Sequence, residues 1–139
     1  MKEANDEKIV DEIMDIIRRK NKDKRVIGLC ENIIIKGSKK EKKVKAKIDT
    51  GASDSSISIR LFREIGETKV VKEVVVERAH EEETRPLVRL LVKCDNKWIE
   101  SEFTVSDRKN MKYEVLIGDN TLRKMHVLVD PEKKDLENL

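Results

Sequence analysis

Aromatic residues are scarce in this 139-residue chain, which has two phenylalanines, one tryptophan and one tyrosine. A hydrophobic core must therefore come mainly from Val, Ile and Leu. The scarcity also argues against binding of single-stranded nucleic acid, because such surfaces stack bases on aromatic side chains. The seven lysines in residues 36–47 leave an RNA contact open. We expect instead a solvated hairpin there, and no nucleic-acid partner.

Cysteine and long apolar runs are also lacking. Cys30 and Cys94 are isolated in the sequence, with neither disulfide-framework nor metal-site spacing. Reduced thiols of this kind are typical of a cytoplasmic protein. No apolar run reaches the roughly 20 residues of a membrane-spanning helix, and the charged N-terminus does not resemble a signal peptide. We therefore expect a cytoplasmic protein without a membrane partner.

Histidine is limited to His80 and His126, and no His-Glu-x-x-His pattern occurs. The sequence thus predicts no metal and no other cofactor. The acidic run 81–83 beside His80 leaves a weak divalent-cation site as an alternative to a solvated loop. Charged residues make up 42% of the chain, but both signs contribute and the net charge is only +3. A balance this close to neutral does not indicate a polyanionic partner.

The hydrophobic pattern predicts one helix followed by many strands. Ile9, Ile13 and Ile16 recur at helical spacing, so a helix is expected over 5–20, capped by Asn5 or Asp6. Short apolar or alternating runs then predict strands at 26–35 (broken near Gly28), 43–49, 56–59, 69–77, 87–93, 98–105, 115–117 and 127–129. Shorter helices are expected at 61–65 and at 119–125, the latter capped by Asp119 or Asn120, and a polar loop or hairpin tip at 78–84. This pattern predicts a mostly β fold, a small closed barrel with short helices and an extra N-terminal helix.

The composition also suggests how the chain is divided. Residues 1–25 are expected to be the N-terminal helix and a linker, 26–131 the barrel domain, and 132–139 a charged tail. The N-terminal helix could serve as a dimerisation element or could cover one end of the barrel, and the sequence leaves both open.

The most informative stretch is Asp49-Thr50-Gly51-Ala52, which directly follows an alternating strand. Gly51 allows close approach of the backbone to the Asp49 carboxylate. Thr50 supplies a hydroxyl for a partner, and Ala52 is small enough to pack beneath the loop. Residues of these types at the end of a strand present a carboxylate at the floor of a cleft. The prediction is a catalytic site of Asp49, Thr50 and Gly51.

A second element supports the first. Ile117 and Gly118 end a short apolar run about 65 residues downstream. In aspartic proteases a similar run supports the catalytic loop, and this similarity implies that Ala52, Ile117 and Gly118 form the loop that supports Asp49. When carboxylates alone activate the water, hydrolysis of a peptide uses two of them that share a proton. Because the chain has one such motif, a two-fold dimer would have to bring Asp49 next to its own copy.

Five blocks in order give the chain a family resemblance: KIDTGA at 47–52, RPLVR at 85–89, DRKNMKY at 107–113, LIG at 116–118 and LVDP at 128–131. Together they resemble the retropepsin-like family often labelled ATP-dependent zinc proteases, whose members are frequently associated with ATP-grasp ligases that add glutamates to a ribosomal protein. The resemblance covers about residues 26–131. The first and fourth blocks are similar to retroviral proteases as well.

The resemblance implies a pepsin-type or retropepsin-like barrel in which Asp49 is the catalytic acid and Thr50 and Gly51 lie in the supporting loop. It implies a homodimeric active site, a peptide or protein substrate, and a flap at the hairpin around 78–84. Two positions depart from the family: Ser53 stands where members usually have a basic residue, and Asp119 stands where they have an Arg. These departures argue against assigning glutamate-rich substrates to this chain.

Three functions follow, in order of preference. The first is a retropepsin-like aspartic endopeptidase acting as a homodimer. The second is a non-catalytic binding or dimerisation module that keeps the fold. The third is a metal-dependent hydrolase.

Overall fold

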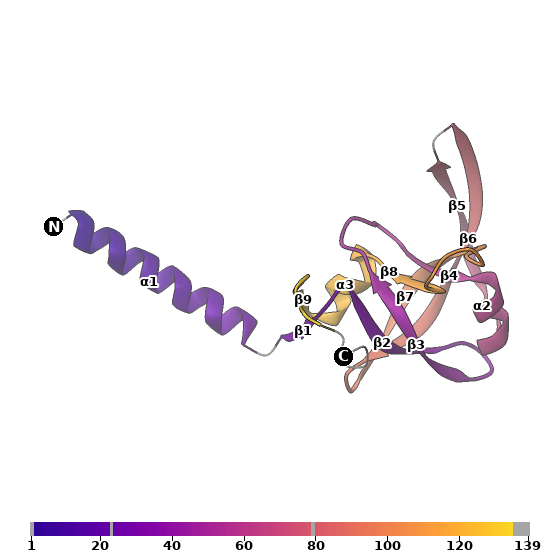
Figure 1. The fold of residues 1–139 in the computed structure, drawn as a ribbon, viewed down its shortest axis with the longest axis horizontal. Coiled ribbons are helices and arrows are strands. Elements are labelled where there is room, and N and C mark those ends of the chain that lie inside the picture. Colours follow the sequence, from indigo (N-terminus) through magenta and orange to yellow (C-terminus); the bar gives the residue numbers. More distant parts are fainter. Residues whose placement is uncertain (1, 23, 79, 135–139) are drawn as a thin grey trace.

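Residues 2–22, 24–78 and 80–134 are described by the computed structural model of the chain. Residue 79, at the expected hairpin tip, and residues 135–139, in the expected tail, lie outside the described ranges. A long helix, α1 (Lys2–Asn21), extends away from the rest of the chain, which is built around a small β-barrel (Figure 1). No helix within the described ranges is both long and apolar enough to cross a bilayer.

Six strands close into a mixed barrel, in the order β2, β3, β8, β4, β7 and β6, and β2 pairs with β6 to complete it. Their bounds are β2 Cys30–Lys36, β3 Glu41–Ile48, β4 Ser55–Ser58, β6 Glu81–Cys94, β7 Lys97–Ser106 and β8 Val115–Ile117. The hairpin predicted between the first two is present, with Cys30 opposite Lys47. The predicted mostly β, closed barrel is therefore confirmed.

The barrel interior is aliphatic, as the scarcity of aromatic residues required. Phe103 is the only aromatic side chain among the largest fully buried ones, which are otherwise Ile, Leu and Val. On β3, Ala46 and Ile48 are buried while Lys47 between them is exposed, because successive strand residues face opposite sides of the sheet. Lys43 and Lys45 share the outer face of the strand with Lys47, whereas Lys42 is on the face of Ala46 and Ile48.

Strand β6 is longer than the sequence indicated. Residues 81–84 were expected in a polar loop or hairpin tip, but residues 81–86 pair with β5 (Val70–Arg78) in a hairpin that rises from the barrel (Figure 1). Pro86 is tolerated because it pairs only with β5, at Glu73, and the pairing of β6 with β7 begins one residue later at Leu87. The cross-strand pairing outweighs the polar composition that favoured a loop.

The cap residues predicted for two helices were wrong, although the range 119–125 of the second is confirmed. Asn5 and Asp6 lie inside α1 rather than at its cap. In α3 (Asp119–Met125), the cap residue is Gly118, which makes no side-chain cap bond, so Asp119 is the first helical residue. Helix α2 (Ile59–Ile65) ends at Gly66, whose φ of 99° favours glycine, and begins with the Ser58 hydroxyl accepting a bond from Leu61 N.

A separate two-stranded sheet joins the two ends of the barrel domain. Strand β1 (Arg25–Ile27) pairs in parallel with β9 (Val127–Val129). The predicted break near Gly28 is present, and it separates β1 from β2. As a result β1 is not part of the hairpin with β3, and it lies against the C-terminal strand instead.

Candidate active site

Asp49 is held at the end of β3 by the neighbouring strand. Ile48 pairs with Ile117 of β8, and Asp49 N donates to Ile117 O at 2.9 Å. The peptide that carries the carboxylate therefore continues the ladder of the barrel rather than belonging to a free loop. The position of the Asp49 Cα is set by the rigid strand β8.

The carboxylate itself is fixed by the glycine that follows. Gly51 N donates to Asp49 Oδ1 at 2.9 Å, and a Cβ added to Gly51 would lie 3.3 Å from the same oxygen. Asp49 is half-buried, while Thr50 and Gly51 are exposed. The loop thus presents an oriented carboxylate at the surface of one chain, with the Thr50 hydroxyl exposed beside it.

Gly118 brings the second predicted element against this loop. Asp119 N donates to Ala52 O at 2.7 Å, and Asn120 N donates to Ser53 O at 3.3 Å. A Cβ at Gly118 would lie 2.6 Å from Asp54 O and 2.9 Å from Ala52 O, so only glycine fits between the two segments. The structure therefore brings together the predicted residues 49–52 and 117–118, which are far apart in the sequence.

A buried network of hydroxyl and amide groups, which the sequence analysis missed, fastens the two segments. The Ser55 hydroxyl accepts from Gly118 N at 2.9 Å and donates to Asn120 Oδ1 at 2.9 Å, and Asn120 Nδ2 donates to Glu102 O at 2.9 Å. Thr121 joins this network through hydroxyl contacts with Ser55 at 2.5 Å and Ser101 at 2.8 Å. The available signal was the serine-rich strand Ser55–Ser58, because a serine buried in a strand must find a partner.

Ser53 and Asp119, the two positions that depart from the family pattern, have different surroundings. Asp119 forms an ion pair with Arg123 one turn later on α3, with Nε and Oδ2 2.7 Å apart. Ser53 is exposed, and its carbonyl receives the bond from Asn120. Asp119 therefore supports the first turn of α3, where a negative charge is favourable.

Charged side chains form hydrogen bonds and ion pairs at the N-terminal end of β8. Glu114, just before β8, is bonded by Arg60 of α2 and accepts from the Ser58 hydroxyl at 2.8 Å. Burial alone would raise the pKa of Glu114, but the hydrogen bonds from Arg60 and Ser58 and the positive charge of Arg60 together lower it. Nearby, the Lys42 ammonium lowers the pKa of Glu64 through hydrogen bonds of 2.8 and 2.9 Å. These carboxylates are structural and lie outside the Asp49 loop.

A hollow lies beside the Asp49 loop. Its apolar lining comes from Leu122, Val127 and Val129, and Thr50, Asp119 and Arg123 contribute polar groups. Leu128 and Val26, on the adjacent two-stranded sheet, are 37% and 42% exposed. The surface next to Thr50 is therefore partly apolar.

His126 lines the hollow beside Thr50, whereas His80 is not among the residues around it. His80 is exposed at the tip of the β5–β6 hairpin, and His126 is the left-handed C-terminal residue of α3, with φ of 55°. Within 2–22, 24–78 and 80–134, no three His, Cys, Asp or Glu side chains are grouped so that they could hold a metal ion.

The sequence comparison decides the family. Residues 62–138, more than half of the chain, match the model of the RimB-like family, described as retropepsin-like aspartic endopeptidase RimB. The chain belongs to the RimB-like family. The resemblance to retropepsin-like proteases is thus confirmed. The matched region of this RimB-like chain includes Gly118 but not Asp49, so the case for Asp49 rests on the geometry. No curated protein matches the chain.

Solved structures share the fold. A Legionella pneumophila DUF785 protein of unknown function, Lpg0085, is 19% identical with a TM-score of 0.57, over 81% of this RimB-like chain and 97% of that protein. The EIAV protease complexed with the inhibitor HBY-793 is 13% identical with a TM-score of 0.53, over 77% and 91% of the two chains. The protease of simian foamy virus is 20% identical with a TM-score of 0.51, over 77% and 99%.

Proposed function

We propose that this chain is an aspartic endopeptidase that acts as a homodimer, with one Asp49 from each subunit. The observation that carries the proposal is the fixed carboxylate, which Gly51 N orients while β8 holds its backbone. Membership of a family of aspartic endopeptidases supports the same chemistry. The substrate class would be a peptide or a protein.

The dimer follows from the chemistry that a peptidase needs. Two carboxylates about 3 Å apart cannot both ionise, so the pair holds one proton between them. The ionised Asp49 would take a proton from a water, and that water would attack the peptide carbonyl. The protonated Asp49 of the other subunit would polarise the carbonyl oxygen and then return a proton to the leaving amine. The barrel supplies one carboxylate, and two-fold symmetry supplies the second.

The surface beside the loop has the character that such a dimer requires. Thr50 is exposed next to Asp49, and the hollow beside it is lined by Leu122, Val127 and Val129. Apolar residues next to an exposed hydroxyl suit an interface that is buried only when two subunits meet. Thr50 would donate or accept a bond across the two-fold axis, next to the paired carboxylates.

The test is the Asp49→Asn variant. It removes the ionisable group at nearly constant shape, so we expect loss of peptide cleavage by at least about a thousandfold with an unchanged unfolding midpoint. Asp54→Asn is the matched control, because Asp54 is an exposed aspartate of the same connection. Cleavage of a peptide library would be followed by mass spectrometry. Activity that survives Asp49→Asn would disprove the proposal.

The second candidate is a binding module that keeps the fold without hydrolysis. It is favoured by one observation, that the matched family region begins at residue 62, after the Asp49 loop. A wild-type dimer that binds peptides but never cleaves them, whether or not Asp49 is present, would establish this function instead.

A further inference from the structure

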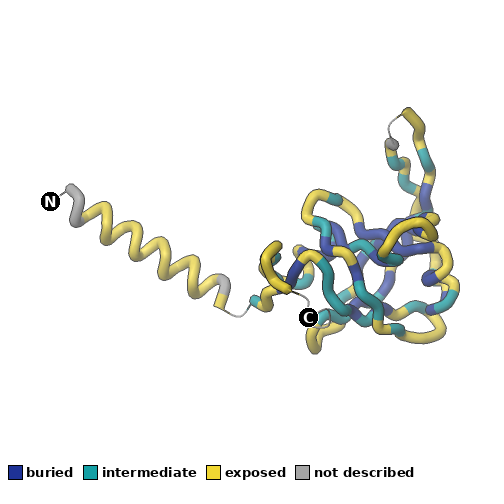
Figure 2. Tube along the Cα trace, in the orientation of Figure 1, coloured by how far each residue is buried: buried dark blue, intermediate teal, exposed yellow. Residues whose placement is uncertain are grey.

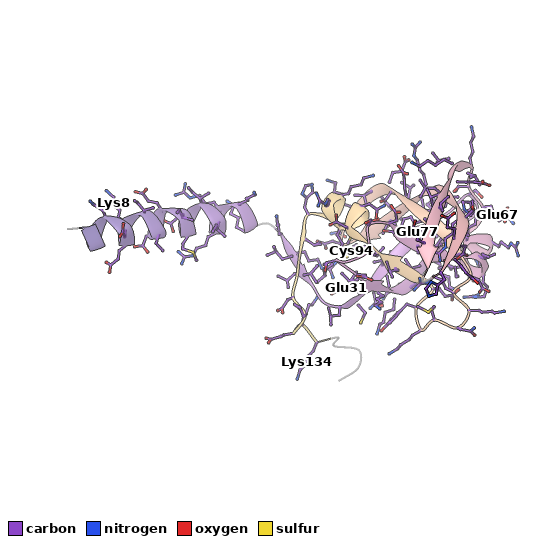
Figure 3. The ribbon with its side chains drawn as sticks, turned by 90° about the horizontal axis from the view of Figure 1, so that it is seen from above. Lys8, Glu31, Glu67, Glu77, Cys94 and Lys134 are labelled. Carbon is purple, nitrogen blue, oxygen red and sulfur yellow. The ribbon has the colours of Figure 1, made fainter. Side chains whose placement is uncertain are left out.

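Helix α1 has an apolar face that the barrel does not cover. Six apolar side chains lie on one side of the helix, and each is between 42% and 61% exposed: Ile9, Val10, Ile13, Met14, Ile16 and Ile17. Every described side chain of α1 from 5 to 20 is exposed (Figure 2). Seen from above, the side chains of α1, with Lys8 labelled, lie clear of the barrel (Figure 3).

This arrangement leaves the helix without a source of stability. A helix in a folded protein is stabilised mainly by packing of its apolar face rather than by its own propensity. In α1 the one ion pair given by the structure, between Arg18 and Asp15, is at the surface and joins residues of the same helix. A partner must therefore cover the six apolar residues.

The charges on the same face identify the partner. Asp6, Ile13 and Lys20 follow one another at intervals of seven residues, which is close to two helical turns, so they lie along one line of the helix. The acid lies toward the N-terminal end, the cation toward the C-terminal end, and the apolar residues lie between them. We propose that this face binds α1 of a second copy of the chain in antiparallel orientation.

Antiparallel pairing is favoured because the face is complementary to itself when reversed. With the two-fold axis near Ile13, Asp6 of each helix lies near Lys20 of the other, and Ile13 meets its own copy. A parallel pair would instead place Asp6 beside Asp6 and Lys20 beside Lys20, both repulsive. The three consecutive cations 18–20 would add to that repulsion.

The pairing uses a surface different from the one around Thr50. An antiparallel pair of α1 helices places the two barrels at opposite ends, so it does not itself bring the Asp49 loops together. A barrel dimer and a helix dimer would then join the chains through two separate two-fold interfaces. The inference therefore stands or fails independently of the peptidase proposal.

Charge reversal in the full-length chain tests the proposal. Asp6→Lys or Lys20→Asp should each weaken self-association roughly tenfold, since each places like charges together. The double variant Asp6→Lys/Lys20→Asp exchanges the charges and should restore association to the wild-type level. Sedimentation equilibrium over a range of matched concentrations gives the average mass and the association constant, and both should fall in the single variants whether or not the barrels also associate.

Two further variants complete the experiment. Asp11→Lys is the matched control, because it makes the same charge change on the opposite face of α1 and should leave the mass unchanged. Ile13→Glu should abolish the association, while thermal unfolding shows that the barrel is intact. A wild-type mass that none of these changes alters would overturn the proposal. Failure of the double variant to recover would overturn the antiparallel orientation.

Discussion

Gly118 occupies a position where a single methyl group would disturb the carboxylate loop. Two backbone oxygens, of Asp54 and Ala52, lie within 2.9 Å of the place where a Cβ would stand. Neither is the end of a flexible side chain, so neither can move aside without moving the loop. The residue thus couples packing behind the loop to the orientation of Asp49.

We expect Gly118→Ala to lower the free energy of unfolding by about 1–3 kcal/mol, because the added methyl overpacks a rigid contact. Urea unfolding followed by circular dichroism measures the change. Gly51→Ala is the control for stability, since its added Cβ meets only the Asp49 side chain, at 3.3 Å. Equal stability of the two variants would contradict this account of Gly118.

At the scale of the secondary-structure elements, the β5–β6 hairpin projects from the barrel core (Figure 1). Val75 on β5 is 62% exposed, and the tip is bounded by Arg78 and Glu81, which face each other. A projecting, solvent-exposed hairpin opens at lower free energy than the barrel does. The flap expected at this hairpin stays a prediction, and most of the residues expected at its tip are strand.

Shortening this hairpin tests its role as a flap. Val76 and Glu83 lie opposite each other, so an Asn-Gly turn can replace residues 77–82 between them. We expect an unchanged barrel, judged by its unfolding midpoint, and a fall of at least roughly tenfold in kcat/KM for peptide cleavage, because a closing flap positions substrate and excludes water. Undiminished cleavage would show that the hairpin is not a flap.

The same elements show what the sequence could and could not predict. Alternation in β3 and the apolar run before Gly118 were local signals, and they predicted both strands and their meeting at Asp49. The extent of β6 could not be predicted from local sequence. Its residues 81–86 are mostly polar, and they become strand only through pairing with β5. The Ser55, Asn120 and Thr121 network was missed for the same reason, since its partners are about 65 residues apart.

At the scale of the whole molecule, ion pairs between distant segments should make stability depend on pH. Glu64 of α2 bonds to Lys42 of β3, and Glu114 before β8 bonds to Arg60 of α2. The pKa of each carboxyl is lowered in the folded chain. As the pH falls below the ordinary carboxyl pKa of about 4.3, the unfolded chain therefore takes up these protons first.

We therefore expect the stability contributed by Glu64 and Glu114 to be fully present above that pH and to be lost as the pH falls through their lowered pKa values. Urea unfolding at several pH values between about 6 and 3 would show the loss. The double variant Glu64→Gln/Glu114→Gln should have a shallower dependence on pH than the wild type. An equal slope in the two proteins would show that these pairs do not contribute.

The parallel pairing of β1 with β9 determines how the barrel responds to mechanical force. The chain enters the barrel domain at the start of β1 and leaves it at the end of β9, and in a parallel pair these points lie at opposite ends of the ribbon. Tension applied between the two termini therefore loads the hydrogen bonds of the pair in shear, all together, instead of opening them one after another. A motor that pulled on either terminus would have to break the β1–β9 pair before it could unfold the carboxylate loop.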